Sequence, residues 1–136
     1  MIIDPLKDYP GYVLRRASAA SMQKLALRLE RLDLRPSEAS VLLVIEANPR
    51  ITQSEAGRLL DIAGANMAPL MRRLVERNLV ERLPANGRSQ GLRLTSRGRT
   101  LSAKVRTIVQ SHETELLARI PPAQREAFVR ALQMLF

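Results

Sequence analysis

Residues 52–82 decide the fold and read TQSEAGRLLDIAGANMAPLMRRLVERNLVER. Thr52 and Glu55 form a capping box, in which a hydroxyl and a carboxylate satisfy exposed backbone N–H groups, so a helix starts near Gln53. A short turn that contains Gly64 joins this helix to a second one. The second helix directs its apolar side chains inward: Met67, Leu70, Met71, Leu74 and Val75. Two helices joined in this way form a helix-turn-helix, whose second helix enters the major groove of DNA.

The second helix contains a proline at residue 69, which breaks an otherwise regular pattern. A proline in a helix interior costs about 3 kcal/mol, because it lacks an N–H and clashes with the carbonyl four residues earlier. With Asn66 as N-cap, Pro69 becomes the third helical residue, whose N–H needs no intrahelical partner. The sequence therefore predicts a late helix start or a kink. The helix ends at Asn78, which tolerates the left-handed conformation.

A β-hairpin follows directly, because the apolar periodicity changes from helical to alternating. Its strands are expected over residues 79–83 and 92–95, and Asn86-Gly87 between them is a strong turn signal. The hairpin forms a wing beside the helix-turn-helix. Its tip carries Arg88, which can reach the minor groove, where negative potential attracts guanidinium groups.

Four further helices flank this unit. The first is expected from Tyr12 to about Leu32, after an extended arm over residues 1–11, and the second runs from Pro36 to about Ala47. A long helix capped by Thr95 extends to about residue 119, and a last helix follows Pro121-Pro122. The single histidine, His112, lies on the apolar stripe of the long helix, which favours a packed side chain over a ligand-sensing one.

Composition narrows the classes of function. The chain has 136 residues and a formal net charge of +9, with ten basic residues against two acidic ones between residues 72 and 106. Clustered arginine indicates a polyanion as partner. The absence of cysteine and the presence of one histidine leave few parts for catalysis, and we expect no enzyme activity, no metal site and no cofactor. No segment reads as a signal peptide or a membrane span, so the expected location is cytoplasmic.

In the order and spacing of these motifs the chain resembles the MarR family of winged helix-turn-helix repressors. The matching segments are Thr52–Leu60, Ile62, Arg72–Arg77, Leu79–Arg82, Gly87–Ser89 and Leu92–Gly98. The resemblance implies a mainly α fold with a small β-hairpin wing and one MarR-like unit over residues 1–136. It assigns residues 36–98 to the DNA-binding region, and 10–33 and 99–136 to a helical dimerisation region. It also implies a homodimer that binds a palindromic operator on double-stranded DNA, and a small effector, often an aromatic acid, that relieves repression.

The expected DNA contacts lie on both helices of the motif and on the wing. Asn66 is the best candidate for reading adenine and Arg73 for guanine or phosphate, and Ala65 and Pro69 can touch thymine methyl groups. Arg82 is a further phosphate candidate. The complete set of DNA-binding candidates is Thr52, Gln53, Ala65, Asn66, Pro69, Arg72, Arg73, Arg77, Arg88, Ser89 and Arg93.

The effector site is the least readable part of the sequence. By resemblance it is lined from the first, second and fifth helices, and the nearest candidates for binding an aromatic carboxylate or a phosphate are Tyr12, Arg15 and Arg16. The alternative is that both arginines are merely exposed and that Tyr12 packs at the dimer interface.

Two other classes of nucleic-acid-binding protein also have a strongly basic sequence. An architectural DNA-binding protein without ligand control remains the alternative, and it would coat any duplex uniformly. RNA binding is disfavoured, because none of the four aromatic residues lies in the basic region to stack on bases.

Overall fold

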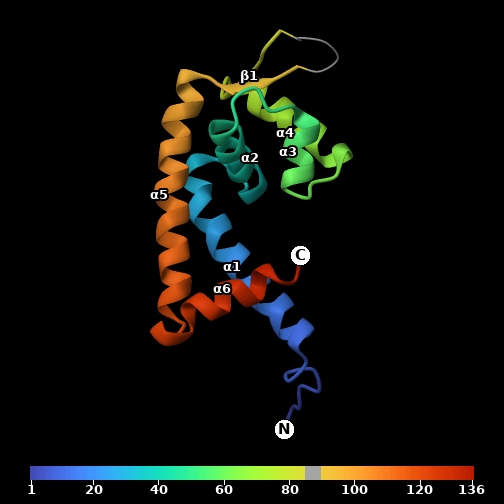
Figure 1. Cartoon of the computed structure of the whole chain (residues 1–136), viewed down its shortest axis with the longest axis vertical. Coiled ribbons are helices and arrows are strands. Elements are labelled where there is room, and N and C mark those ends of the chain that lie inside the picture. The colour runs from blue at the N-terminus through green and yellow to red at the C-terminus, as the bar shows by residue number, and fades with distance from the viewer. Residues whose placement is uncertain (85–89) are drawn as a thin grey trace.

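The computed structural model describes residues 1–84 and 90–136, and within these ranges the chain is mainly helical with one antiparallel hairpin (Figure 1). The winged helix-turn-helix order expected from the sequence is confirmed. The elements are α1 (Pro10–Leu29), η1 (Glu30–Leu32), α2 (Pro36–Ala47), α3 (Gln53–Leu59), α4 (Gly64–Glu76), β1 (Val80–Arg82), β2 (Leu92–Leu94), α5 (Ser96–Ala118), η2 (Pro122–Gln124) and α6 (Arg125–Gln133).

The first two helices meet at a tight junction. The α-helical part of the first ends at Leu29, and a 3-10 turn continues to Leu32, where the long helix was expected to end. Asp33 then adopts a left-handed φ of 51°, which turns the chain out of the helical path. Pro36 occupies the first position of α2, as predicted, where its missing N–H leaves no bond unmade.

The capping box at the start of α3 is confirmed and is tied to the hairpin. Thr52 Oγ1 accepts from the Glu55 backbone N–H at 3.1 Å, and Glu55 accepts from the Thr52 N–H at 2.8 Å. These hydrogen bonds lower the pKa of Glu55, the one from the Thr52 backbone most strongly. Thr52 also pairs with Gly91 across an isolated bridge, where a Cβ on the glycine would lie 2.9 Å from the Arg50 carbonyl oxygen. Helix α3 therefore starts in register with the hairpin.

The start of α4 differs from the sequence prediction. Its N-cap is Ala63 and its first residue Gly64, so the late start at Asn66 is wrong. Pro69 consequently lies inside a helix that runs unbroken to Glu76, and cannot bond the carbonyl of Ala65. Residues 63–66 are all exposed, so the carbonyl that the proline leaves without a helical partner faces solvent instead of a closed core.

The end of α4 and the hairpin follow the prediction more closely. Asn78 takes a left-handed φ of 56° directly after the helix. The two strands pair antiparallel, with Val80 opposite Leu94 and Arg82 opposite Leu92. The turn expected at Asn86-Gly87 lies outside the described residues.

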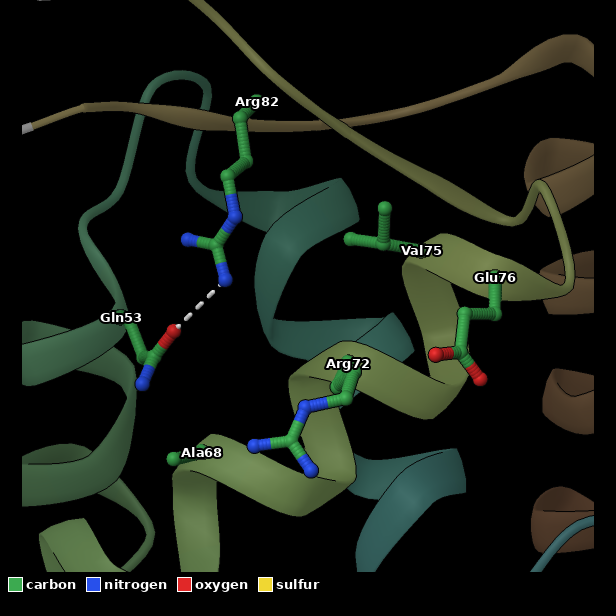
Figure 2. A pocket seen from close by; sticks show the side chains of 6 residues that line it. All are labelled: Gln53, Ala68, Arg72, Val75, Glu76 and Arg82. Atoms are coloured by element: carbon green, nitrogen blue, oxygen red, sulfur yellow. Dashed lines mark hydrogen bonds between the residues drawn. The ribbon is translucent and has the colours of Figure 1, made fainter.

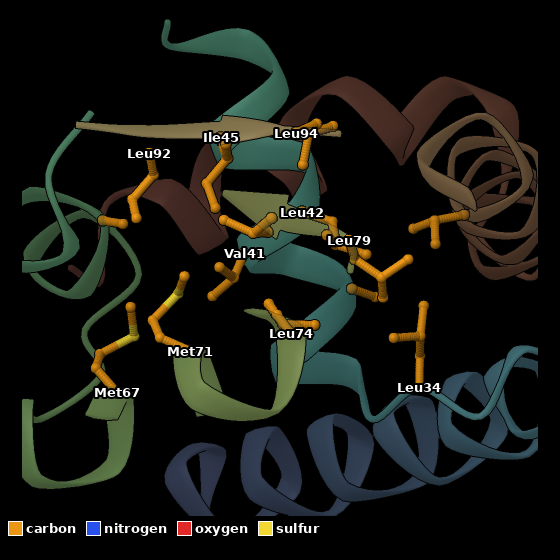
Figure 3. Packing of buried hydrophobic residues seen from close by; sticks show 14 of the residues in the cluster. Leu34, Val41, Leu42, Ile45, Met67, Met71, Leu74, Leu79, Leu92 and Leu94 are labelled. Carbon is orange, nitrogen blue, oxygen red and sulfur yellow. The ribbon is translucent and has the colours of Figure 1, made fainter. Parts of the chain in front are cut away.

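The core sits between α2, α4 and the hairpin, and α5 closes it from the side (Figure 3). Met67, Met71 and Leu74 project from α4 into this core, as the apolar stripe predicts, whereas Leu70 and Val75 are half-buried. Their partners are fully buried side chains that include Leu42 from α2 and Leu92 from β2. Packing against this core fixes the orientation of α4, and with it the face that α4 presents to solvent.

Two contacts fix the long helix α5. At its start, Thr95 caps the helix by accepting from the Gly98 N–H at 2.9 Å, and a Cβ on Gly98 would lie only 2.0 Å from the Leu79 carbonyl oxygen. Farther along, His112 is 5% exposed and its Nε2 lies 3.0 Å from Ser21 Oγ of α1. The packed histidine expected from the sequence is confirmed.

Candidate nucleic-acid interface

Three elements form one surface at the end of the molecule that carries the hairpin (Figure 1). They are the start of α3, the outer face of α4 and strand β1. A hydrogen bond joins the first to the third, since Gln53 Oε1 accepts from Arg82 Nη2 at 3.1 Å. This bond holds the Arg82 guanidinium over the groove between α3 and α4.

A cavity of about 270 Å³ lies between these elements (Figure 2). Figure 2 shows the Gln53–Arg82 pair on one side of it and the Arg72 side chain on α4 facing the same space. Its lining is Gln53, Ala68, Arg72, Val75, Glu76 and Arg82. Two guanidinium groups and one carboxylate leave the cavity positively charged. Forked N–H donors of this kind match phosphate oxygens or the edge of guanine.

The N-terminal half of α4 leads outward from this cavity along an exposed face. Ala65, Asn66, Pro69 and Arg72 are all exposed there, as the sequence predicts. Ala63 is the N-cap of α4 and no side chain caps the helix, so the Asn66 amide makes no capping hydrogen bond. It can therefore donate and accept in the way that adenine recognition requires.

Arg73 and Arg77 direct their guanidinium groups away from the exposed face that carries Arg72, although the Arg73 side chain stays 39% exposed. Arg73 Nε donates to Glu38 Oε2 at 2.8 Å, and Arg77 Nη1 donates to the Asp33 carbonyl at 2.6 Å. The bond to Glu38 and its charge raise the pKa of Arg73 above the ordinary arginine value. Glu38 is only 2% exposed, and a buried carboxylate is stable only when it is paired with a cation. This pairing determines the direction of the Arg73 side chain.

The remaining predicted DNA contacts have mixed placements. Arg93 is exposed but pairs with Glu81 across the hairpin, with Nε 2.7 Å from Oε1. Thr52 is half-buried and its hydroxyl is used in the capping box. Arg88 and Ser89 lie outside the described residues. Of the predicted set, the structure thus brings Gln53 and Arg72 together with Arg82, and leaves Arg93 at the outer edge.

The three effector candidates form a separate cluster on α1. Arg16 Nη1 donates to the Tyr12 hydroxyl at 3.0 Å, and the Arg15 guanidinium carbon lies 5.4 Å from the centre of the Tyr12 ring. The Tyr12 hydroxyl in turn donates to Asp4 of the N-terminal arm at 3.4 Å. The cluster therefore combines an aromatic face with two cations, and an internal carboxylate already occupies its edge.

Some contributors to the site were missed by sequence reasoning. Ala68 and Glu76 line the cavity, and both lie four residues from Arg72, a spacing that places side chains on one helix face and could have identified them. No local signal could have identified Glu38, because its partner is 35 residues away in sequence. In the described ranges, no group of acidic or histidine side chains is arranged to hold a metal ion. None of the helices described is long and apolar enough to cross a membrane.

Comparisons with known proteins agree with this geometry. Residues 32–89 match the model of the MarR family. An HTH-type transcriptional repressor of Mycobacterium bovis is 30% identical over 128 residues, which cover 92% of this chain and 91% of the relative.

Solved structures extend the likeness to the whole fold. The transcriptional repressor CouR bound to a 23-mer DNA duplex superposes with a TM-score of 0.91 at 28% identity, covering 99% of this chain and 97% of that one. CouR bound to p-coumaroyl-CoA gives a TM-score of 0.88 at 29% identity, over 99% and 96% of the two chains. The Mycobacterium tuberculosis protein Rv2887 in complex with salicylic acid gives 0.75 at 30% identity, over 96% and 98%.

Proposed function

Because this chain belongs to the MarR family, we propose that it is a sequence-specific DNA-binding repressor whose operator affinity is lowered by a small aromatic effector. Its partner is a palindromic operator on double-stranded DNA, and it acts as a homodimer. The function is regulatory and needs no catalytic step or cofactor. Such a repressor works where the chromosome lies, so we place its action in the cytoplasm.

The observation that carries the proposal is the cationic groove between α3, α4 and β1. Gln53 orients Arg82 from one wall, and Arg72 reaches the same space from α4. The exposed residues Ala65 and Asn66 continue the surface toward the N-terminus of α4, the end that reads bases in helix-turn-helix proteins. We assign backbone phosphates to the groove and base edges to Asn66. Arg88 stays a predicted minor-groove contact, and Ser89 a predicted DNA contact, of the wing.

Dimerisation is proposed from the apolar side chains that the single chain leaves exposed. Met22 and Leu27 on α1 are 47% and 60% exposed, and Val129 on α6 is 38% exposed. A second copy would cover these faces and place two reading surfaces side by side, as a palindromic site requires.

We propose an aromatic acid or its thioester as the effector, supported by what CouR and Rv2887 bind in their structures. In this chain the Tyr12 ring with Arg15 and Arg16 offers an aromatic face and two cations. An effector carboxylate or phosphate would compete with Asp4 for this cluster. Weaker operator binding on addition of p-coumaroyl-CoA or salicylate would support this part of the proposal. An architectural protein would bind DNA without any such response.

The decisive experiment uses an operator duplex selected in vitro from random DNA by the wild-type protein. Arg72→Ala should weaken binding about tenfold or more and reduce the slope of log K against log salt by about 1, since one phosphate contact is lost. Lys7→Ala, in the N-terminal arm, removes the same charge outside both the groove and the dimerisation region and should leave both quantities unchanged. Selection of no preferred sequence, or equal effects of the two variants, would contradict the proposal.

A further inference from the structure

The junction between α1 and α2 is bonded to the recognition helix α4 through two arginines. Arg73 and Arg77 direct their guanidinium groups to acceptors in residues 32–38, on the side of α4 opposite the groove. We name the two arginines and their acceptors, Leu32, Asp33 and Glu38, the junction clamp.

The geometry of the junction clamp uses the donors of both guanidinium groups. Arg73 Nε lies 2.8 Å from Glu38 Oε2, and Arg73 Nη2 lies 3.2 Å from the Asp33 carbonyl and 3.4 Å from its carboxylate. Arg77 donates to the Asp33 carbonyl at 2.6 Å and to the Leu32 carbonyl at 3.1 Å. A lysine could not repeat either arrangement, because it offers a point charge and not a planar fork.

Glu38 shows that the clamp is built into the fold. Its Oε1 accepts from the Arg35 N–H at 2.9 Å, which caps α2, while its Oε2 holds Arg73. Turning Arg73 outward to DNA would leave a carboxylate that is 2% exposed without its cation. Such a step is unfavourable, because an uncompensated buried charge is costly.

The acceptors lie where α1 enters the rest of the molecule. Asp33 has a left-handed φ of 51°, and the buried Leu34 donates back to the Leu29 carbonyl at 3.3 Å. Helix α1 before this turn carries the exposed apolar residues of the proposed dimer interface, and α4 after it carries the reading face. The junction clamp therefore joins the recognition helix to the turn that follows α1 and to the first turn of α2.

We propose that Arg73 and Arg77 are positioning residues that hold α4 at a fixed orientation to α1, and so set the placement of the two reading faces on the operator. The inference rests on the proposed function. Arg73 and Arg77 were both predicted to contact DNA, and the inference assigns them a positioning role instead. A shift of α1 relative to its partner copy is carried to α4 through these bonds.

The sharpest variant is Glu38→Gln, because the two readings of Arg73 predict opposite signs. If Arg73 were a DNA contact, loss of the competing carboxylate would raise the net charge by one and would preserve or tighten binding. If the clamp positions α4, operator affinity falls about tenfold, while affinity for an unrelated duplex does not fall. Arg73→Lys, which keeps the charge, should show the same selective loss. Arg106→Lys changes an α2–α5 ion pair that does not touch α4, and should retain wild-type binding.

A distance measurement tests the clamp without DNA. The chain contains no cysteine, so Lys24→Cys on α1 and Ala65→Cys on α4 accept one spin label each in the full-length protein. Diluting the doubly labelled chain with unlabelled protein confines the measured distance to one protomer. We expect Glu38→Gln and Arg73→Lys to broaden or shift this distance and Arg106→Lys to preserve it.

Unchanged operator affinity together with an unchanged distance in both clamp variants would overturn the inference. If the wild-type protein selects no operator, the proposed function fails, and the distance measurement still decides whether the clamp fixes α4. Circular dichroism of each variant verifies that helix content is retained, and Arg73→Lys serves if Glu38→Gln does not fold.

Discussion

The winged region buries its apolar side chains within the chain, whereas the terminal helices α1 and α6 leave most of theirs at least partly exposed. From Leu34 to Val105 the chain closes a continuous buried cluster with its own residues. In contrast, Leu29 is the one buried residue of α1, and α6 has none. In the sequence, the helices of both regions carry apolar residues at helical spacing. A stripe therefore predicts which face of a helix is apolar, whereas the partner that covers it follows from the tertiary and quaternary structure.

The largest expected effect breaks the winged side of this comparison. Leu42 is fully buried at the centre of α2, and Leu42→Ala should lower the free energy of unfolding by about 3 kcal/mol, since it removes packed methyl groups and leaves a cavity. Urea unfolding at a fixed protein concentration measures this change. The matched change at Leu59, which is 63% exposed, should cost far less. Equal losses at the two positions would contradict the core described above.

A smaller effect is expected on the terminal side. Val129→Glu places a charge in the exposed apolar face of α6 and should weaken dimerisation on the order of 100-fold, about 2.7 kcal/mol. Ala127→Glu adds the same charge at an exposed position of that helix that faces away from Val129, and it serves as control. Sedimentation velocity across a concentration series gives both dissociation constants. Wild-type association of the valine variant would remove α6 from the interface.

The smallest effect concerns the seam between the two regions, where Glu46 of α2 meets α5. Hydrogen bonds from Arg106, and then from Ser102, lower the pKa of Glu46 below 4.5. The stabilisation is therefore complete above the unfolded pKa and is lost as the pH falls through the lower folded value. Glu46→Gln should cost about 0.5 kcal/mol at pH 7. The difference from wild type should close as unfolding is measured at progressively lower pH below 4.5. A constant difference would contradict the linkage.

The sequence predicted those parts of the fold that depend on local chemistry. The capping box at Thr52, the proline at the start of α2 and the left-handed Asn78 are each specified by residues within one turn. The start of α4 was predicted wrongly, because local rules favoured Asn66 as cap over a proline inside the helix. The backbone instead starts the helix at Gly64, and the Met67 N–H donates to the Ala63 carbonyl at 3.0 Å.

For the site, the same division holds. Exposure of Asn66 and Arg72 follows from helical periodicity once the apolar face is known. The orientation of Arg73 does not follow from helical periodicity, because the buried Glu38, 35 residues away in sequence, binds its guanidinium. Charge counting placed Arg72 and Arg73 in one basic patch, although their side chains leave α4 on different sides. Long-range ion pairing is the term that one-dimensional patterns lack.

Gly98 brings the start of α5 into close contact with the backbone before β1. A Cβ there would lie 2.0 Å from the Leu79 carbonyl oxygen, so the helix starts in direct contact with the chain leading into β1. The helix has 23 residues and is about 35 Å long. If the end of α5 at the hairpin stays in place, a displacement of about 3 Å at the other end tilts the helix axis by only about 5°. At the hairpin, such a displacement would appear as a small rotation with almost no translation.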